Sequence, residues 1–194
     1  MKRFFSKMIA LSVGIIALGS ASFSSAVELP IEKQADMLIK IMGYNKSIES
    51  NSREIRIGIL YSEQVPNIEK KIQQLDDIFY DYISNNRTVK GKSIQYSFIP
   101  VSSSENLKEK IKLLNVSALY VFSISDQNLQ QVINVAKQEK IFTYSGTKSY
   151  FNKGVAVVVD EQESSPKIFV DVQNAKDQGA QFNAELLKIA KLSM

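Results

Sequence analysis

Small hydroxyl-bearing residues follow several of the apolar segments that we interpret as strands. They stand where each strand is expected to end, and helical patterns begin soon after three of them. The carboxyl ends of parallel strands meet at one edge of a sheet, where ligands commonly bind. Helix starts at that edge offer free backbone N–H groups, which suit a small anion or polar ligand. The candidate ligand-binding residues are therefore Ser62, Ser102, Ser123, Ser125, Ser145, Gly146 and Thr147.

The same residues also have a simpler structural interpretation. Ser102 is followed three residues later by Glu105, which is the spacing of a capping box. Ser125 or Asp126 precedes the next helical pattern in the same way. Serine is among the most favoured residues at helix N-caps, so capping and turn formation account for these positions without a ligand. Both interpretations are kept as hypotheses.

Three aromatic residues, Tyr144, Tyr150 and Phe151, gather around one expected loop. Aromatic side chains dominate the energetically important centres of protein interfaces, so this loop is a candidate partner-binding patch. The alternative is that the three rings cover the edge of the sheet.

The residue types that are missing exclude several reaction classes. The chain contains no Cys and no His, so Ser-His-Asp and Cys-His catalysis, thiolate metal sites and His-containing zinc sites are excluded. Asp160, Glu161 and Glu163 match no calcium-loop spacing, and we interpret them as part of a solvated hairpin turn. The sequence predicts no catalytic residue, no metal site and no cofactor, and therefore no enzyme.

The first 26 residues have the layout of a secretory signal peptide. Lys2, Arg3 and Lys7 precede an apolar run of eleven residues at 8–18, and a small, mostly polar segment ends at Ala26. The alternative is a membrane anchor, but the run is short of the roughly 20 residues that span a bilayer. We therefore expect a signal peptide at 1–26 and a periplasmic domain at 27–194 that has no membrane span after cleavage.

The positive charge of the chain belongs mostly to this leader. It holds three of the 24 basic residues and no acidic residue, which leaves 21 basic and 20 acidic residues in the following 168. A net charge of +1 and the lack of an arginine-rich stripe argue against nucleic acid as a partner.

Apolar periodicity predicts a single α/β domain. Strand patterns at 55–61, 93–101, 118–122 and 140–144 alternate with helical patterns, which favours parallel pairing through right-handed crossovers. Two further strands at 154–160 and 167–172 form a hairpin, and a final helix follows Asn183. We expect a three-layer sandwich, in which a mostly parallel sheet has helices on both faces and the antiparallel C-terminal hairpin lies at one edge.

The C-terminal third resembles the YfiR-like periplasmic proteins. The resemblance is carried by the loop from Tyr144 to Phe151, by the strand segments 153–157 and 168–172, and by a closing motif that runs from Ala175 through Gly179 to the 182–190 helix. The chain has Lys153–Gly154 where the family often has a Gly pair, and it lacks the cysteines of several members. The resemblance spans residues 31–192.

This resemblance implies a function that the residues alone do not. In the best-known branch of the family, the periplasmic protein represses a membrane diguanylate cyclase by contacting its periplasmic segment, which lowers cyclic-di-GMP signalling and biofilm formation. The implied role here is an exported, non-catalytic regulator of an inner-membrane signalling protein, with a homodimer as a candidate assembly. The alternative is a periplasmic small-solute binding protein or a single binding lobe.

Overall fold

A single eight-stranded sheet organises the chain. The structure is a computed structural model that describes residues 29–49, 54–102, 106–162 and 165–193. The strand order across the sheet is β2-β3-β1-β4-β5-β6-β7-β8. The strands are β1 (Glu54–Tyr61), β2 (Thr88–Val89), β3 (Lys92–Pro100), β4 (Ala118–Ser123), β5 (Phe142–Ser145), β6 (Val157–Gln162), β7 (Ser165–Asp171) and β8 (Lys191–Ser193).

Most strand pairs are parallel. The five strands from β3 to β6 run in one direction, whereas β2 pairs antiparallel with β3, and β6 and β7 form an antiparallel hairpin. The short β8 then pairs parallel with β7. The expected mostly parallel sheet with an antiparallel C-terminal hairpin at one edge is confirmed.

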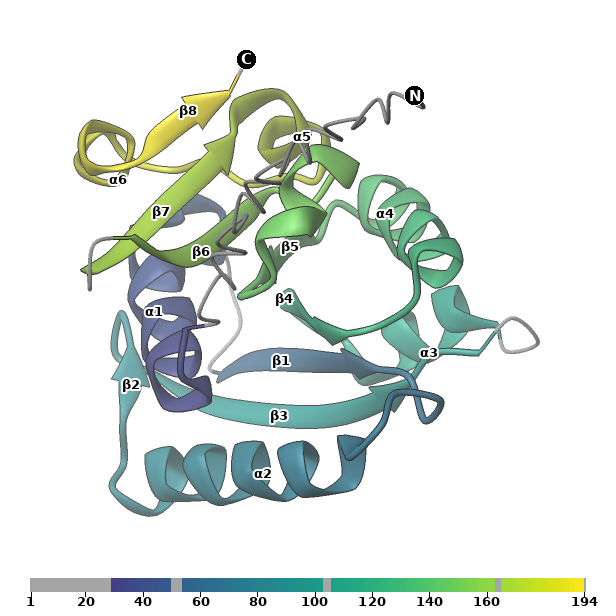
Figure 1. Cartoon of the computed structure of the whole chain (residues 1–194). Coiled ribbons are helices and arrows are strands. Elements are labelled where there is room, and N and C mark those ends of the chain that lie inside the picture. The colour runs from purple at the N-terminus through teal and green to yellow at the C-terminus, as the bar shows by residue number, and fades with distance from the viewer. Residues whose placement is uncertain (1–28, 50–53, 103–105, 163–164, 194) are drawn as a thin grey trace, which may run out of the picture.

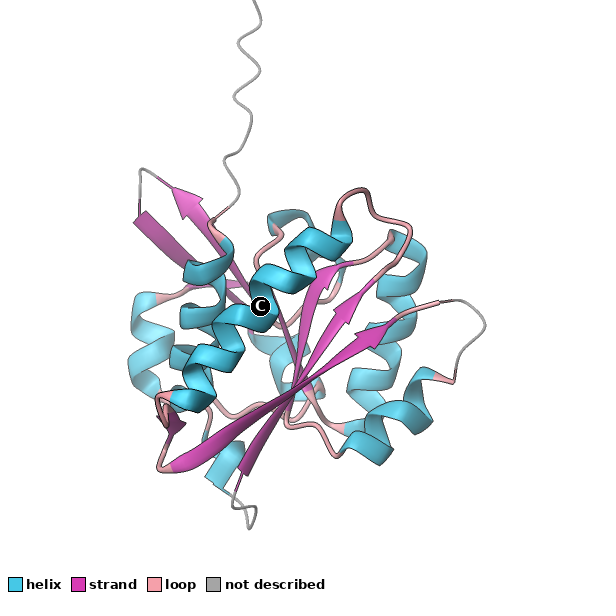
Figure 2. Cartoon of the chain, turned by 90° about the horizontal axis from the view of Figure 1, so that it is seen from below, coloured by secondary structure: helices cyan, strands magenta, loops and turns pink. Residues whose placement is uncertain are grey.

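Helices cover both faces of this sheet (Figures 1 and 2). The α-helices are α1 (Ile31–Tyr44), α2 (Ile68–Ser84), α3 (Leu107–Leu114), α4 (Asp126–Glu139), α5 (Val172–Asp177) and α6 (Ala184–Ile189), and the 3-10 helices are η1 (Lys46–Glu49) and η2 (Lys148–Lys153). One hydrophobic core joins α1 and α2 to the sheet, and a second joins α3 and α4 to the opposite face. This is the expected three-layer sandwich.

Alternation along the central strands produces the two cores. Ile57 and Ile59 of β1 pack on the α1–α2 side, whereas Leu60 packs on the α3–α4 side. Gly58 faces that second side, where an added Cβ would lie 3.0 Å from Cδ1 of Ile99. Apolar residues on both faces are typical of a central strand in a parallel sheet, which accounts for the strand pattern at 55–61.

Two expected helix features are corrected. The third helix begins at Leu107 and is capped by Asn106, whose Oδ1 accepts a hydrogen bond from the backbone N–H of Glu109, so Ser102 is not its cap. The expected C-terminal helix ends at Ile189, and the chain continues as β8. Leu186 is the buried residue of α6. The residues after the helix pair with β7 and so do not extend its buried face.

Buried tyrosines lead to a prediction about alkaline pH. Burial raises the pKa of Tyr144 well above its ordinary value of about 10. Burial and a hydrogen bond to Asp76 raise the pKa of Tyr96 to about 12. Burial and a hydrogen bond to Asp36 raise the pKa of Tyr82 in the same direction.

The folded state therefore keeps these phenols protonated where the unfolded chain ionises them. Their contribution to stability is complete below about pH 10 and declines as the pH rises toward and beyond 12. Phenolate absorbance should show a late-titrating group of tyrosines, whose ionisation coincides with loss of the circular dichroism signal. A single midpoint near pH 10 with the fold intact would contradict this expectation.

Candidate functional site

The sheet changes its direction of winding at β1. The chain leaves β1 toward α2 on one face and leaves β4 toward α4 on the other face. Because β1 and β4 are neighbours, the loops after their carboxyl ends separate at this point. Open parallel sheets bind ligands in the crevice that such a switch point creates.

A pocket of about 240 Å³ lies at this switch point, and we call it the strand-end pocket. Ser62, Ser102 and Ser125, from the loops after β1, β3 and β4, all line it. The structure therefore brings these three predicted residues together. Loop residues Glu63 and Gln64 and helix residues Gln127 and Asn128 complete its polar lining.

Several of these polar groups also hold the loops in place. The Oγ of Ser125 accepts a hydrogen bond from the backbone N–H of Asn128 at 3.3 Å, so Ser125 is the N-cap of α4, as one interpretation of the sequence expected. The Nδ2 of Asn128 donates to the Val101 carbonyl at 3.1 Å. Ser62 is 2% exposed, and its backbone N–H donates to the Ser123 carbonyl at 2.7 Å. Ser123 does not itself line the strand-end pocket, but its carbonyl holds Ser62 in position.

The candidate residues at the end of β5 and directly after it occupy a different position. Ser145 is fully buried, and its Oγ donates to the Val121 carbonyl at 2.6 Å and accepts from the backbone N–H of Thr147. Gly146 lies against Gln34 of α1, where an added Cβ would overlap the Gln34 side chain. Neither Ser145, Gly146 nor Thr147 lines the strand-end pocket.

Two of the three predicted partner-binding aromatics are in the core. Tyr144 is fully buried, and its hydroxyl donates to the Gln34 carbonyl at 2.6 Å. Tyr150 is 7% exposed, and its hydroxyl donates to the Ile124 carbonyl and accepts from the Ile124 N–H. The exposed patch expected from the sequence is therefore reduced to Phe151, which is half-buried.

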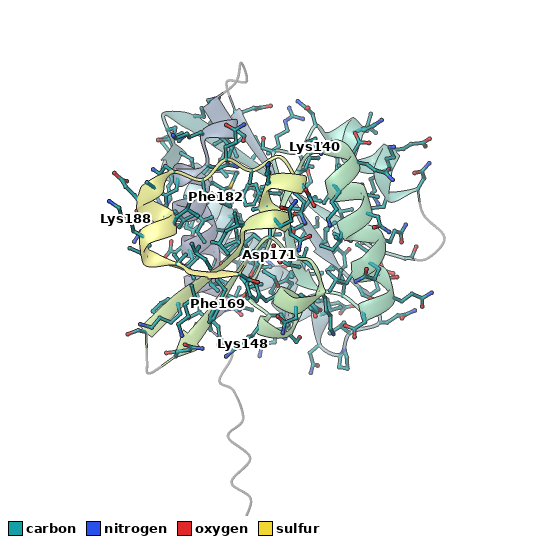
Figure 3. The ribbon with its side chains drawn as sticks, turned by 90° about the horizontal axis from the view of Figure 1, so that it is seen from above. Lys140, Lys148, Phe169, Asp171, Phe182 and Lys188 are labelled. Atoms are coloured by element: carbon teal, nitrogen blue, oxygen red, sulfur yellow. The ribbon has the colours of Figure 1, made fainter. Side chains whose placement is uncertain are left out.

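Phe151 belongs to a mixed aromatic and basic surface on the C-terminal half of the sheet. Its ring centroid lies 5.7 Å from that of Phe169 on β7. The Nζ atoms of Lys148 and Lys191 lie 5.8 and 5.4 Å from the Phe169 centroid, a cation–π arrangement. Figure 3 labels Phe169 and Lys148. The sequence did not point to this cluster, because its members lie on η2, β7 and β8, which only the tertiary structure brings together.

One acidic residue near the hairpin lies in a different environment from the one expected. Asp160 is 6% exposed rather than part of a solvated turn, and its carboxylate pairs with Nζ of Lys148 at 2.8 Å. Glu163 lies outside the described residues. Within the described ranges, no group of three or more acidic side chains is arranged to hold a metal ion.

Comparison with solved structures supports the class of fold, an α/β domain. A conserved domain protein from Vibrio cholerae matches with a TM-score of 0.59 and 13% identity over 85% of this chain and 60% of that chain. An ABC domain in complex with L-Trp from Streptococcus pneumonia matches with a TM-score of 0.56 and 12% identity over 84% and 61%. A ligand-free, open substrate-binding protein with adhesive properties from Clostridium difficile gives 0.53 and 16% over 85% and 60%.

The chain belongs to the YfiR/HmsC-like family, whose model matches residues 31–191. The resemblance noted in the C-terminal third is thereby confirmed for nearly the whole described domain. The chain spans about three fifths of the length of the solved structures that it matches, so their similarity concerns the fold alone. No curated protein sequence matches the chain. No helix in the described part of the chain is both long and apolar enough to cross a bilayer.

Proposed function

We propose that this protein is an exported, non-catalytic regulator that binds the periplasmic segment of an inner-membrane signalling protein, of the diguanylate cyclase type. The family match over residues 31–191 is the observation that carries the proposal. The signal-like leader at 1–26 lies outside the described residues and supports the periplasmic location by its sequence alone.

The chemistry of the strand-end pocket supports binding rather than catalysis. The polar part of its lining consists of hydroxyl and amide groups with one charged side chain, Glu63, among the described residues. Several of these groups already serve as caps or loop supports, and the chain offers no His or Cys to act beside them. No acid–base pair or activated nucleophile results from this set.

A deletion experiment tests the regulatory role. Removing the gene should raise cellular cyclic-di-GMP, because the repressed cyclase is released. The full-length chain should restore the original level, whereas a chain lacking residues 2–26 should not, because it stays in the cytoplasm. Unchanged cyclic-di-GMP after deletion would contradict the proposed repressor role.

The second candidate function is small-solute binding, either by itself or as the stimulus for regulation. It is supported by the strand-end pocket at the switch point and by neighbours that include a substrate-binding protein.

Thermal shifts with a panel of metabolites test this candidate. The panel should include the free amino acids, since one neighbour was solved with L-Trp. Gln64→Ala should reduce any stabilisation, and Gln95→Ala, on the exposed surface of β3, is the matched control. The absence of any shift would argue against this candidate.

A further inference from the structure

A second pocket, of about 490 Å³, lies between α1 and β2, away from the strand-end pocket. We call it the α1–β2 pocket, after the two elements that flank it, which Figure 1 labels. Met37, Ile39 and Val89 contribute apolar surface, and Gly43 of α1 also lines it. β2 is the outermost strand on its side of the described sheet, so a partner segment can approach the pocket along the sheet edge.

The charged lining of this pocket is predominantly basic. Lys40, Arg87 and Lys90 contribute three positive charges, and Asp36 contributes the one negative charge among the described lining residues. Lys40 and Lys90 are exposed, and Nζ of Lys90 is held near the Asn45 carbonyl at 3.0 Å. The pocket therefore combines an apolar floor with a basic rim.

Arg87 is held rigidly in this rim. Its Nη1 lies 2.6 Å from Oδ1 of Asp36, and its guanidinium carbon lies 4.2 Å from the centroid of the Tyr82 ring. The hydroxyl of Tyr82 donates to the same Asp36 oxygen at 2.8 Å. Nη1 of Arg87 is thus paired with a carboxylate, which compensates part of its positive charge. Lys40 and Lys90 lie on separate elements, so carboxylates spaced along a peptide suit them better than a single compact anion.

Gly43 keeps the pocket open at a cost to its helix. It occupies the last turn of α1, and an added Cβ there would meet no atom within 4 Å. Glycine in a helix interior is less favourable than alanine by about 1 kcal/mol. Packing within this chain therefore does not require a glycine at position 43, and the space beside its backbone is open to the α1–β2 pocket.

We propose that the α1–β2 pocket binds an acidic segment of a partner protein that carries aliphatic side chains between its carboxylates. The apolar floor receives the aliphatic groups, and Lys40 and Lys90 face the carboxylates. The inference deepens the proposed function, because it names the surface and the chemistry by which a regulatory partner would be recognised.

The experiment uses the chain without residues 1–26. The probe is a fluorescent peptide of alternating Glu and Leu, and a peptide of alternating Lys and Leu is the charge control. Fluorescence anisotropy should show binding of the acidic peptide alone. The affinity should fall at least tenfold when salt is raised from about 0.05 to about 0.5 M, since exposed charges are then screened. Gly43→Leu should abolish binding because its side chain fills the floor, whereas Gly43→Ala should retain it.

Charge reversal provides the second pair of variants. Lys40→Glu should weaken binding about tenfold, because it replaces an attractive charge at the rim with a repulsive one. Lys70→Glu makes the same change on the exposed surface of α2, outside the pocket, and should have no effect. Thermal unfolding confirms that all four variants are folded.

Several results would overturn the inference. These are equal binding of the basic peptide, binding that Gly43→Leu leaves intact, and preferential binding to phosphatidylglycerol vesicles. Self-association that Gly43→Leu disrupts would also overturn it, because it would identify a second copy of the chain as the occupant. If the acidic peptide binds but gene deletion leaves cyclic-di-GMP unchanged, the proposed repressor role is refuted and this inference stands. If deletion raises cyclic-di-GMP but the acidic peptide does not bind, the repressor role stands and this inference is refuted.

Discussion

Replacing Gly146 with alanine is expected to destabilise the fold by about 3 kcal/mol, the upper range for overpacking a dense core. The added Cβ would overlap Oε1 and Cδ of Gln34. That side chain cannot move aside freely, because it is 1% exposed, and its Nε2 donates to the Leu29 carbonyl. Its Oε1 also accepts a hydrogen bond from the Tyr120 hydroxyl at 2.7 Å. Gly146 has no positive φ, so the cost arises from this contact alone.

A double-mutant cycle measured by urea denaturation checks the cause. Gln34→Ala alone should lower the free energy of unfolding by about 2 kcal/mol, because the Leu29 carbonyl and the Tyr120 hydroxyl then lose a buried hydrogen-bonding partner. In that background Gly146→Ala should cost almost nothing, since the space it needs is vacant, so the two changes are strongly non-additive. Gly43→Ala is the control, and it should be neutral or stabilising because its Cβ meets open space. Additive losses in the cycle would show that Gly146 is required for another reason.

Replacing Gln178 with glutamate is expected to cost about 4 kcal/mol at neutral pH, within the range for an uncompensated buried charge. Gln178 is fully buried. Its Oε1 accepts hydrogen bonds from N and Oγ1 of Thr143 at 2.8 and 2.7 Å, and its Nε2 donates to the Gly154 carbonyl at 2.8 Å. A carboxylate satisfies the Thr143 donors but turns a negative oxygen toward the Gly154 carbonyl.

The loss caused by Gln178→Glu should depend on pH. Burial and the facing carbonyl raise the pKa of the new carboxyl in the folded state above its unfolded value of about 4.3. The protonated acid can donate to the carbonyl, so the penalty is small below that unfolded value and grows as the pH rises. Denaturation of variant and wild type at about pH 4 and about pH 7 measures the difference. Gln127→Glu, on the exposed start of α4, should show no such dependence, and an equal loss at both pH values would contradict the explanation.

The strand-end pocket was partly predictable. Ser62 and Ser125 were identified because each follows a recognisable strand, and parallel strands place such residues at one edge. The same rule included Ser145 and Thr147, which the structure places outside this pocket. Sequence spacing locates a strand end, but the switch point depends on the order of strands across the sheet, which spacing does not specify.

The α1–β2 pocket could not be anticipated in this way. Lys40 and Lys90 are fifty positions apart in the sequence, and they approach because α1 packs beside the β2–β3 hairpin. Likewise Phe169 meets Lys191 because a short C-terminal segment pairs with β7 instead of extending α6. Three residues of edge strand carry too weak a periodic pattern to be predicted locally.

Local patterns by themselves determined that the chain forms an α/β sandwich with a parallel sheet, because apolar spacing reports which faces of each element must be buried. They also excluded His- and Cys-dependent chemistry, since composition alone decides that. Only the tertiary structure decided which polar residues line a pocket and which close the core, because Gln34 and Gln178 find their partners across long separations in the chain. Burial and pairing of side chains arise when distant elements pack, and no local pattern encodes that geometry.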